Sequence, residues 1–292
     1  MASSTSIDFS TPGTYDITYT TTNPCQDSST VSVTVTAMGD ATFNYSAASY
    51  CVNDALQTPT ITGTGGGSFT VIPAAGLVVD PTTGEFDPST ATTGSYDITY
   101  TTAGGCVGTE TVNVTIDPIE DATFNYSAAS YCVSEAAQTP TITGVGGGNF
   151  TVTPTTGLAV DPVTGEFDPS ISTVGSYDVT YTTAGACPGI ETVAVSIGAL
   201  DDATFNYSAG SYCVDETTAQ IPTITGEAGG AFSVTPTAGI VVDPATGSFI
   251  PNATTPGTYD ITYTTTNPCQ DSSTVSVTIT SCLLYTSPSP RD

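Results

Sequence analysis

Histidine and tryptophan are absent from this sequence, and its only basic residue is Arg291, against 28 acidic residues and a net charge of −27. A chain without a basic patch has no electrostatic means of holding phosphates, which excludes nucleic acid as a partner. A serine or cysteine nucleophile needs a neighbouring base, and the sequence has neither histidine nor lysine to supply one. Because no run of 18 apolar residues occurs, we expect no membrane span in this segment.

What the sequence does contain is a repeat with a period of about 81 residues, which indicates an array of small folding units. The string Asp-Ala-Thr-Phe-Asn-Tyr-Ser-Ala begins at Asp40, Asp121 and Asp202. Residues 11–36 recur almost unchanged as 255–280, so the N-terminus reads as the last strands of one more unit. We expect a partial repeat, three Ig-like repeats and a non-repeat tail at 1–39, 40–120, 121–201, 202–281 and 282–292.

The two ends of the array differ from its middle. The partial repeat at 1–39 holds about two strands, and an isolated hairpin is marginal in water. We expect it to be ordered only if another chain or an upstream segment completes it, because open strand edges pair readily with a second molecule. The tail at 282–292 resembles a translated sequencing adapter, so we exclude it as an artefact from the fold.

Within each repeat, apolar and polar residues alternate with a period of two. Tyr96, Ile98 and Tyr100 show this pattern in the first repeat, and it predicts strands with one buried face. The strands are separated by turn residues, and in the turn that begins at Asp80 the aspartate side chain is expected to cap the backbone. About seven short strands per repeat predict an all-β fold of tandem Ig-like antiparallel β-sandwich repeats.

One stretch of the repeat carries a family resemblance. The run GLVVDPTTGEFDPSTATTGSYDITYTT at 76–102, repeated with changes at 157–183 and 239–265, is similar to the Ig-like domains with a cadherin- or dystroglycan-like fold that occur in tandem in bacterial surface adhesins. The resemblance implies an extracellular stalk or adhesive module and transfers no catalytic residue. Three tyrosines follow a turn glycine here, and each is either a tyrosine corner or simply the first inward residue of its strand: Tyr96, Tyr177 and Tyr259.

Cysteines recur at two places in the repeat, Cys51, Cys132 and Cys213 at the first and Cys25, Cys106, Cys187 and Cys269 at the second. Two cysteines per small unit, without histidine or a Cys-x-x-Cys clip, indicate disulfides rather than zinc. Disulfides persist in oxidising compartments, so the chain is expected to be extracellular or at the cell surface.

We expect each repeat to close its own disulfide, leaving Cys25 unpaired: Cys51–Cys106, Cys132–Cys187 and Cys213–Cys269. This pairing requires the first strand of the repeat to break near residues 46–49, so that Cys51 can approach the turn that holds Cys106. The alternative is a bridge across a repeat junction, such as Cys51–Cys187.

Acidic residues gather where repeats meet, and calcium prefers such oxygen ligands. The candidate ligands are Asp117, Glu120, Asp121, Asp201 and Asp202. The alternative is that these are linker residues that keep an acidic chain soluble, in which case no cofactor is needed. Six acceptor triplets for N-glycosylation also occur, although serine- and threonine-rich strands produce them by chance: Asn44, Asn113, Asn125, Asn149, Asn206 and Asn252.

The expected function is mechanical. The chain is interpreted as a structural segment of an extracellular adhesin, stalk or filament, not an enzyme, whose partners are copies of itself or further repeats end to end. The carboxylate pair Glu85 and Asp87 is the nearest approach to glycosidase chemistry, but the third repeat has Ser248 and Ile250 in its place. The alternative function is an adhesive module that binds a glycan or a protein, with or without calcium.

Overall fold

The computed structural model describes residues 8–22 and 24–281. These residues contain strands and three short 3₁₀ turns, and no α-helix. The tail and Cys282 lie outside the described residues, so the prediction of an adapter artefact is not tested. The described chain forms two compact units, one up to Glu120 together with Gly185–Gly189, and the other from Asp121 to Ala184 together with the residues from Ile190 on.

Each full repeat builds one four-stranded and one two-stranded sheet. In the first repeat the order is β4-β8-β7-β6 and β3-β5. Its elements are β3 (Phe43–Asn44), β4 (Ser49–Cys51), β5 (Thr60–Ile61), β6 (Ser68–Ile72), η1 (Pro88–Thr90), β7 (Gly94–Thr101) and β8 (Thr109–Asp117). All of these pairings are antiparallel except that β4 runs parallel to β8.

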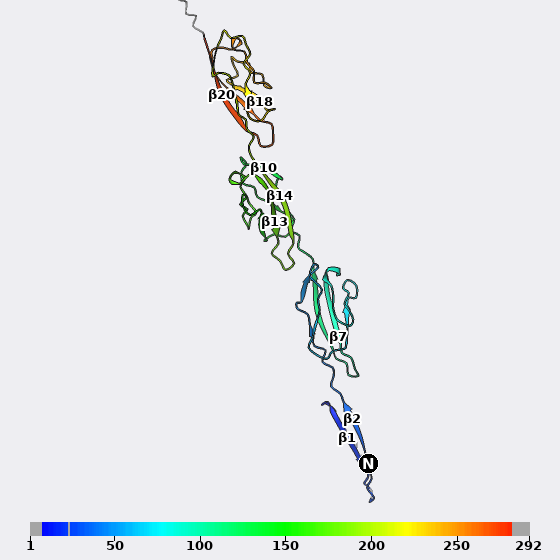
Figure 1. Ribbon diagram of the computed structural model, residues 1–292. Coiled ribbons are helices and arrows are strands. Elements are labelled where there is room, and N and C mark those ends of the chain that lie inside the picture. The colour runs from blue at the N-terminus through cyan, green and yellow to red at the C-terminus, as the bar shows by residue number, and fades with distance from the viewer. Residues whose placement is uncertain (1–7, 23, 282–292) are drawn as a thin grey trace, which may run out of the picture. The chain divides into compact units, whose positions relative to one another are not determined.

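The other two repeats reproduce this order as β10-β14-β13-β12 with β11-β9, and as β16-β20-β19-β18 with β15-β17. Figure 1 labels β10, β13 and β14 of the second repeat, and β18 and β20 of the third. The elements of the second repeat are β9 (Phe124–Asn125), β10 (Ser130–Cys132), β11 (Thr141–Ile142), β12 (Asn149–Thr153), η2 (Pro169–Ile171), β13 (Gly175–Thr182) and β14 (Ile190–Gly198). Those of the third are β15 (Phe205–Asn206), β16 (Ser211–Cys213), β17 (Thr223–Ile224), β18 (Ala231–Thr235), η3 (Pro251–Ala253), β19 (Gly257–Thr264) and β20 (Ser272–Thr280). The predicted fold of tandem Ig-like β-sandwich repeats is confirmed.

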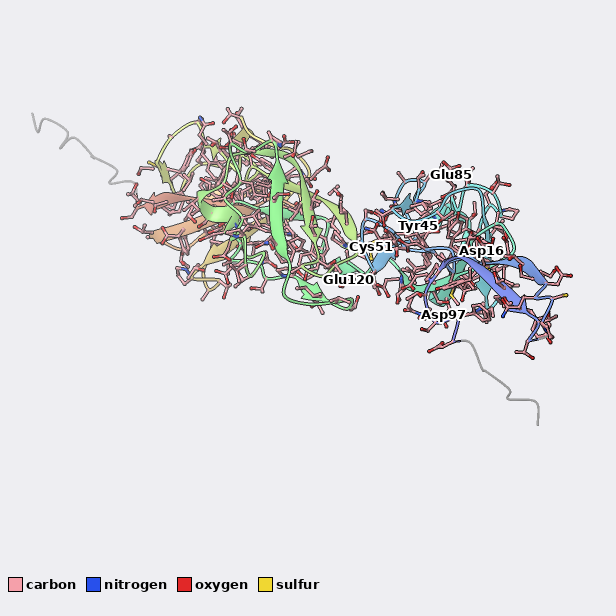
Figure 2. All side chains as sticks on the ribbon, turned by 90° about the horizontal axis from the view of Figure 1, so that it is seen from below. Asp16, Tyr45, Cys51, Glu85, Asp97 and Glu120 are labelled. Carbon is pink, nitrogen blue, oxygen red and sulfur yellow. A yellow bond between two sulfur atoms is a disulfide. The ribbon has the colours of Figure 1, made fainter. Side chains whose placement is uncertain are left out.

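Every repeat has its own aromatic core between its two sheets. In the first, Phe43 from β3 meets Phe69 from β6 with ring centroids 5.4 Å apart, and Phe86 meets Tyr45 at 5.0 Å. The predicted inward residues of β7, Tyr96, Ile98 and Tyr100, are at most 3% exposed. Acidic side chains such as Asp16 and Asp97 lie at the surface instead (Figure 2).

The turn that begins at Asp80 lies between β6 and β7 and joins the bridged residues Val79 and Phe86. The Asp80 carboxylate accepts hydrogen bonds from the Thr82 and Thr83 N–H groups, both at 2.8 Å, as the sequence predicted. The turn ends at Gly84 with φ of 74°, where a Cβ would lie 2.8 Å from the Phe69 ring. Glycine is therefore required both by the backbone conformation and by the close approach of the core.

The partial repeat forms one hairpin of β1 (Gly13–Thr20) with β2 (Ser28–Val35). This matches the two strands expected from the sequence. Its apolar face is uncovered within the described residues. Tyr19 is 73% exposed, whereas its counterpart Tyr100 is 0% exposed.

Of the two interpretations of the tyrosines that follow a turn glycine, the tyrosine corner is present in all three repeats. Tyr96 donates its hydroxyl to the Thr92 carbonyl at 2.8 Å, and Tyr177 and Tyr259 bond back in the same way at 2.7 and 2.9 Å. These rings are also buried, so each tyrosine is both a tyrosine corner and an inward residue of its strand.

Candidate functional site: disulfides between repeats

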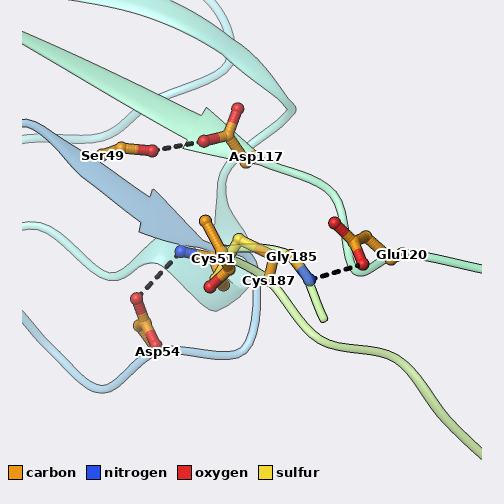
Figure 3. Close-up of a disulfide and its surroundings, with 8 residues drawn as sticks. Ser49, Cys51, Asp54, Asp117, Glu120, Gly185 and Cys187 are labelled. Carbon is orange, nitrogen blue, oxygen red and sulfur yellow. Dashed lines mark hydrogen bonds between the residues drawn. A yellow bond between two sulfur atoms is a disulfide. The ribbon is translucent and has the colours of Figure 1, made fainter. Parts of the chain in front are cut away.

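The first disulfide joins Cys51 of the first repeat to Cys187, which the sequence period assigns to the second. The Cα atoms are 5.4 Å apart, within the normal range for a disulfide. Residues 185–189, which carry Cys187, belong to the first compact unit. The disulfide therefore attaches a loop of one repeat to the strand end of the preceding one (Figure 3).

Polar contacts hold both ends of this disulfide. The Cys51 N–H donates to the Asp54 carboxylate at 2.8 Å, and the Ser49 hydroxyl donates to Asp117 on the neighbouring strand. On the other side, Glu120 binds the loop twice: its N–H donates to the Cys187 carbonyl at 2.9 Å, and its carboxylate accepts from the Gly185 N–H at 3.2 Å (Figure 3). The loop is thus fixed by hydrogen bonds as well as by the disulfide.

A second disulfide repeats this geometry inside the other compact unit. Cys132 bonds to Cys269, with Cα atoms 5.3 Å apart, and the Cys132 N–H donates to the Glu135 carboxylate at 2.9 Å. The strand register places Cys132 opposite Gly198. A Cβ at Gly198 would lie 3.0 Å from the Cys269 sulfur, so the absence of a side chain leaves room for the bond.

The predicted pairing within repeats is wrong, and the alternative across a junction is right. The strand does break after β3, as the prediction required, but β4 then pairs in parallel with β8 and places Cys51 opposite Asp117, at the end of β8. Cys106 lies just before the start of β8, and the nine residues of that strand span roughly 27 Å at about 3.4 Å per residue. Cys51 and Cys106 are therefore at opposite ends of the repeat and cannot bond.

The same correction applies to Cys132–Cys187 and Cys213–Cys269, because Cys187 and Cys269 are taken by cysteines of the preceding repeats. Cys106 and Cys25 are free and exposed, so Cys25 is free as expected, whereas Cys106 was wrongly assigned a partner. Cys213 is not free. The sequence did not predict that Asp54 and Glu135 accept hydrogen bonds from the N–H groups of Cys51 and Cys132. The available signal was an acid three residues after each cysteine of the first set, Asp54, Glu135 and Glu216.

The junction acids predicted to bind calcium have mostly local hydrogen-bond partners. Asp121 accepts from the Thr123 N–H at 2.9 Å and Asp202 from the Thr204 N–H at 2.9 Å. The Thr123 and Thr204 hydroxyls are the larger cause of a pKa lowered below the ordinary value for both aspartates. Asp201 differs, since its Oδ2 is buried and is the one such oxygen in the described chain without a hydrogen-bond partner.

No group of three or more acidic or cysteine side chains close enough to hold a metal ion occurs among the described residues. Calcium at the junctions therefore stays a prediction, and the Asp201 oxygen is the atom best placed to test it.

The other candidate residues have structural or surface positions. All six sequon asparagines are exposed, and the Asn113 amide also donates to Asp97 at 2.7 Å, so glycosylation stays a prediction. Asp87 caps the 3₁₀ turn η1 by accepting from the Ser89 N–H at 2.9 Å. Glu85 accepts from the Thr58 hydroxyl at 3.1 Å, so both carboxylates of that pair support loops.

The chain is similar in structure to tandem extracellular domains. Protocadherin gamma B7 extracellular cadherin domains 1–4 are 12% identical, with 88% of this chain and 80% of that chain covered and a TM-score of 0.28. Mouse cadherin-23 EC22–24 is 14% identical over 83% and 100% of the two chains, with a TM-score of 0.27. Sidekick-1 immunoglobulin domains 1–5 are 12% identical over 94% and 67%, with a TM-score of 0.33. No family model and no curated protein matches the sequence.

Two disulfides join described cysteines, and such bonds form and persist outside the cytosol. The protein is therefore extracellular or at the cell surface. A search of the described residues for a helix long and apolar enough to cross a membrane finds none.

Proposed function

We propose that the chain is a structural repeat segment of an extracellular adhesin, stalk or filament, and that it is not an enzyme. The observation that carries the proposal is the placement of the disulfides. Each one links a strand end of one sequence repeat to a loop of the next, at sequence separations of 136 and 137 residues. Neighbouring repeats are thus joined covalently at two places, by the backbone and by the disulfide.

The remaining chemistry supports a scaffold. With the boundaries proposed from the sequence, near 40, 121 and 202, each repeat contains one complete core of its own. Repeat arrays of this kind gain stability from each unit and from the interfaces between neighbours. A disulfide across the interface adds to the second contribution, which is the one that resists bending and pulling.

The test is electron microscopy of the full chain before and after reduction. If the disulfides stiffen the array, oxidised particles will show a narrower distribution of bend angles than reduced particles. The Cys106→Ser variant is the matched control, because Cys106 is free and its loss should change neither distribution. Equal distributions in the oxidised and reduced samples would contradict the proposed function.

A second candidate function is a protein-binding module, favoured by a groove that recurs at one place in two repeats. In the first repeat the groove has a volume of about 380 Å³ and includes Leu56, Val78 and Phe86. In the third it has about 400 Å³ and includes Val241 and Phe249. Val78 and Val241 are 79% and 81% exposed, an apolar surface better suited to a protein segment than to a sugar. This function predicts that Val241→Asp weakens adhesion to a target surface while the bend-angle distribution stays the same.

A further inference from the structure

Three loops occupy equivalent places in the chain, and their cysteines differ in state. Cys187 and Cys269 are bonded to cysteines of a Ser-Tyr-Cys strand in the preceding repeat. Cys106 is the equivalent residue of the first repeat, and it is free and exposed, whereas Cys187 is 4% exposed. The same residue in the same loop is thus bonded wherever the preceding repeat is complete.

The Cys106 loop already has the backbone arrangement of the bonded loops. The Gly39 N–H donates to the Cys106 carbonyl at 2.8 Å, just as Glu120 donates to Cys187 and Asp201 to Cys269, both at 2.9 Å. Gly39 packs closely here, since a Cβ on it would lie 2.3 Å from the Thr102 hydroxyl oxygen. The loop is therefore held in place before any disulfide forms.

A strand that presents a partner cysteine would also find an open sheet edge to pair with. In the first repeat, β4 lies along β8 with Cys51 opposite Asp117, three residues before Glu120. The period maps β8 onto β2, Asp117 onto Thr36 and Glu120 onto Gly39. Among the described residues, β2 pairs only with β1, so the edge that β4 would use is unoccupied.

The apolar face of the same hairpin shows what would cover it. Tyr15, Ile17 and Tyr19 correspond to Tyr96, Ile98 and Tyr100 of β7. In the full repeat these three are buried against residues that precede β7 in the sequence, such as Phe43, Phe69 and Phe86. A further repeat of this sequence could thus pair with the open edge of the hairpin, cover its apolar face and bond to the nearby thiol.

We propose that the free edge of β2 and the Cys106 thiol form one docking site for the Ser-Tyr-Cys strand of a further repeat of this kind. The strand pairs in parallel with β2 and places its cysteine opposite Thr36, beside the Gly39–Cys106 contact. Strand addition supplies affinity through main-chain hydrogen bonds, and the disulfide then makes the joint permanent. This proposal rests on the proposed structural function and names its partner.

The covalent step is a thiol–disulfide exchange. The Cys106 thiolate attacks the sulfur of a strand cysteine held as a mixed disulfide with a small thiol such as glutathione. The bond between Cys106 and the strand cysteine forms as the bond to glutathione breaks, and the departing thiolate takes up a proton. The small disulfide is the oxidant, so no other electron acceptor is needed.

The test uses the full chain and a recombinant fragment of residues 40–93, whose single cysteine, Cys51, is first converted to its glutathione mixed disulfide. We expect a disulfide between the fragment and Cys106, formed at least tenfold faster than the reaction of Cys106 with glutathione disulfide alone. Cys106→Ser should abolish the adduct, and the matched control Cys25→Ser should leave it unchanged. Peptide mapping with a glutamate-specific protease identifies the cysteine used.

Hydrogen exchange provides a second readout that does not depend on thiol reactivity. Docking should protect amides of Ser28–Val35, and a fragment carrying Cys51→Ser should protect them at sufficient concentration. Equal reaction at Cys25 and Cys106, a Cys106 dimer of the full chain in place of the adduct, or no gain in protection would overturn the docking site. None of these results would remove the Cys51–Cys187 disulfide, so the structural function would stand or fall separately by microscopy.

Discussion

The tyrosine hydroxyls of the core lock loops to strands. Tyr100 donates to the Thr64 carbonyl at 2.8 Å and accepts from the Gly67 N–H at 2.9 Å, which fixes the glycine-rich turn before β6. Tyr100→Phe leaves both groups without this partner, and we expect a loss of about 1–2 kcal/mol in the free energy of unfolding. Tyr19→Phe is the matched control in the exposed hairpin and should change stability by less than about 0.5 kcal/mol. Urea unfolding followed by tyrosine fluorescence measures both, and equal effects would contradict the role of the hydroxyl.

The unpartnered oxygen of Asp201 separates the two interpretations of the junction acids. Without calcium, Asp201→Asn removes a partly buried negative charge from a chain of net charge −27. The free energy of unfolding should then rise by about 1 kcal/mol, and the melting temperature should rise with it. Glu120→Gln is the control, because its carboxylate already accepts from Gly185 and an amide oxygen can do the same. A lower melting temperature in Asp201→Asn, together with a fall of the wild-type value on adding chelator, would instead show that calcium binds there.

Among the elements, the aspartate turns make stability depend on pH. Backbone N–H groups, Thr83 first and Thr82 second, lower the pKa of Asp80 in the folded chain, and Asp161 and Asp243 are held in the same way by their turns. A pKa lowered on folding stabilises the fold above the unfolded value, here 3.8, and this contribution is lost as the pH falls through the folded value.

Replacing all three of these aspartates by asparagine keeps a side-chain acceptor in each turn and removes the titration. We expect the wild-type melting temperature to lie above that of the triple variant at pH 7, because only the wild type has the charged acceptors, and the difference to shrink as the pH falls below about 3.8. Calorimetry between pH 2 and pH 7 measures both profiles. Parallel profiles over that range would show that the turns do not carry the dependence.

At the scale of the whole molecule, the two disulfides overlap in sequence and limit how far the chain can be pulled out. With both closed, the part between Cys51 and Cys269 can extend only as far as its shortest linking segment, 132–187. Reduction should therefore lengthen the fully extended chain by about 57 nm, at roughly 3.5 Å per residue. Single-molecule pulling of a Cys213→Ser chain measures this difference, and an oxidised length equal to the reduced one would contradict the linkage.

The sequence by itself determined the properties that depend on neighbouring residues. Alternating residues such as Tyr96, Ile98 and Tyr100 specify strands with one buried face, and the turn at Asp80 is built from its own side chain and backbone, so both could be predicted locally. The period predicted the repeats, and the cysteine content predicted an oxidising compartment outside the cytosol. The cysteine pairing could not be predicted in this way, because it depends on which end of the repeat each cysteine reaches.

Only the tertiary structure decided that point. A three-residue strand, β4, runs parallel to β8, and this non-local pairing carries Cys51 to the end of the repeat opposite Cys106. Nothing in the residues 49–51 states the direction or the partner of that strand, since a short strand can pair either way. The position of β4 results from packing Tyr50 into the core of the repeat against Phe86. Because of that packing, Cys51 bonds to a cysteine of the next repeat and not to one of its own.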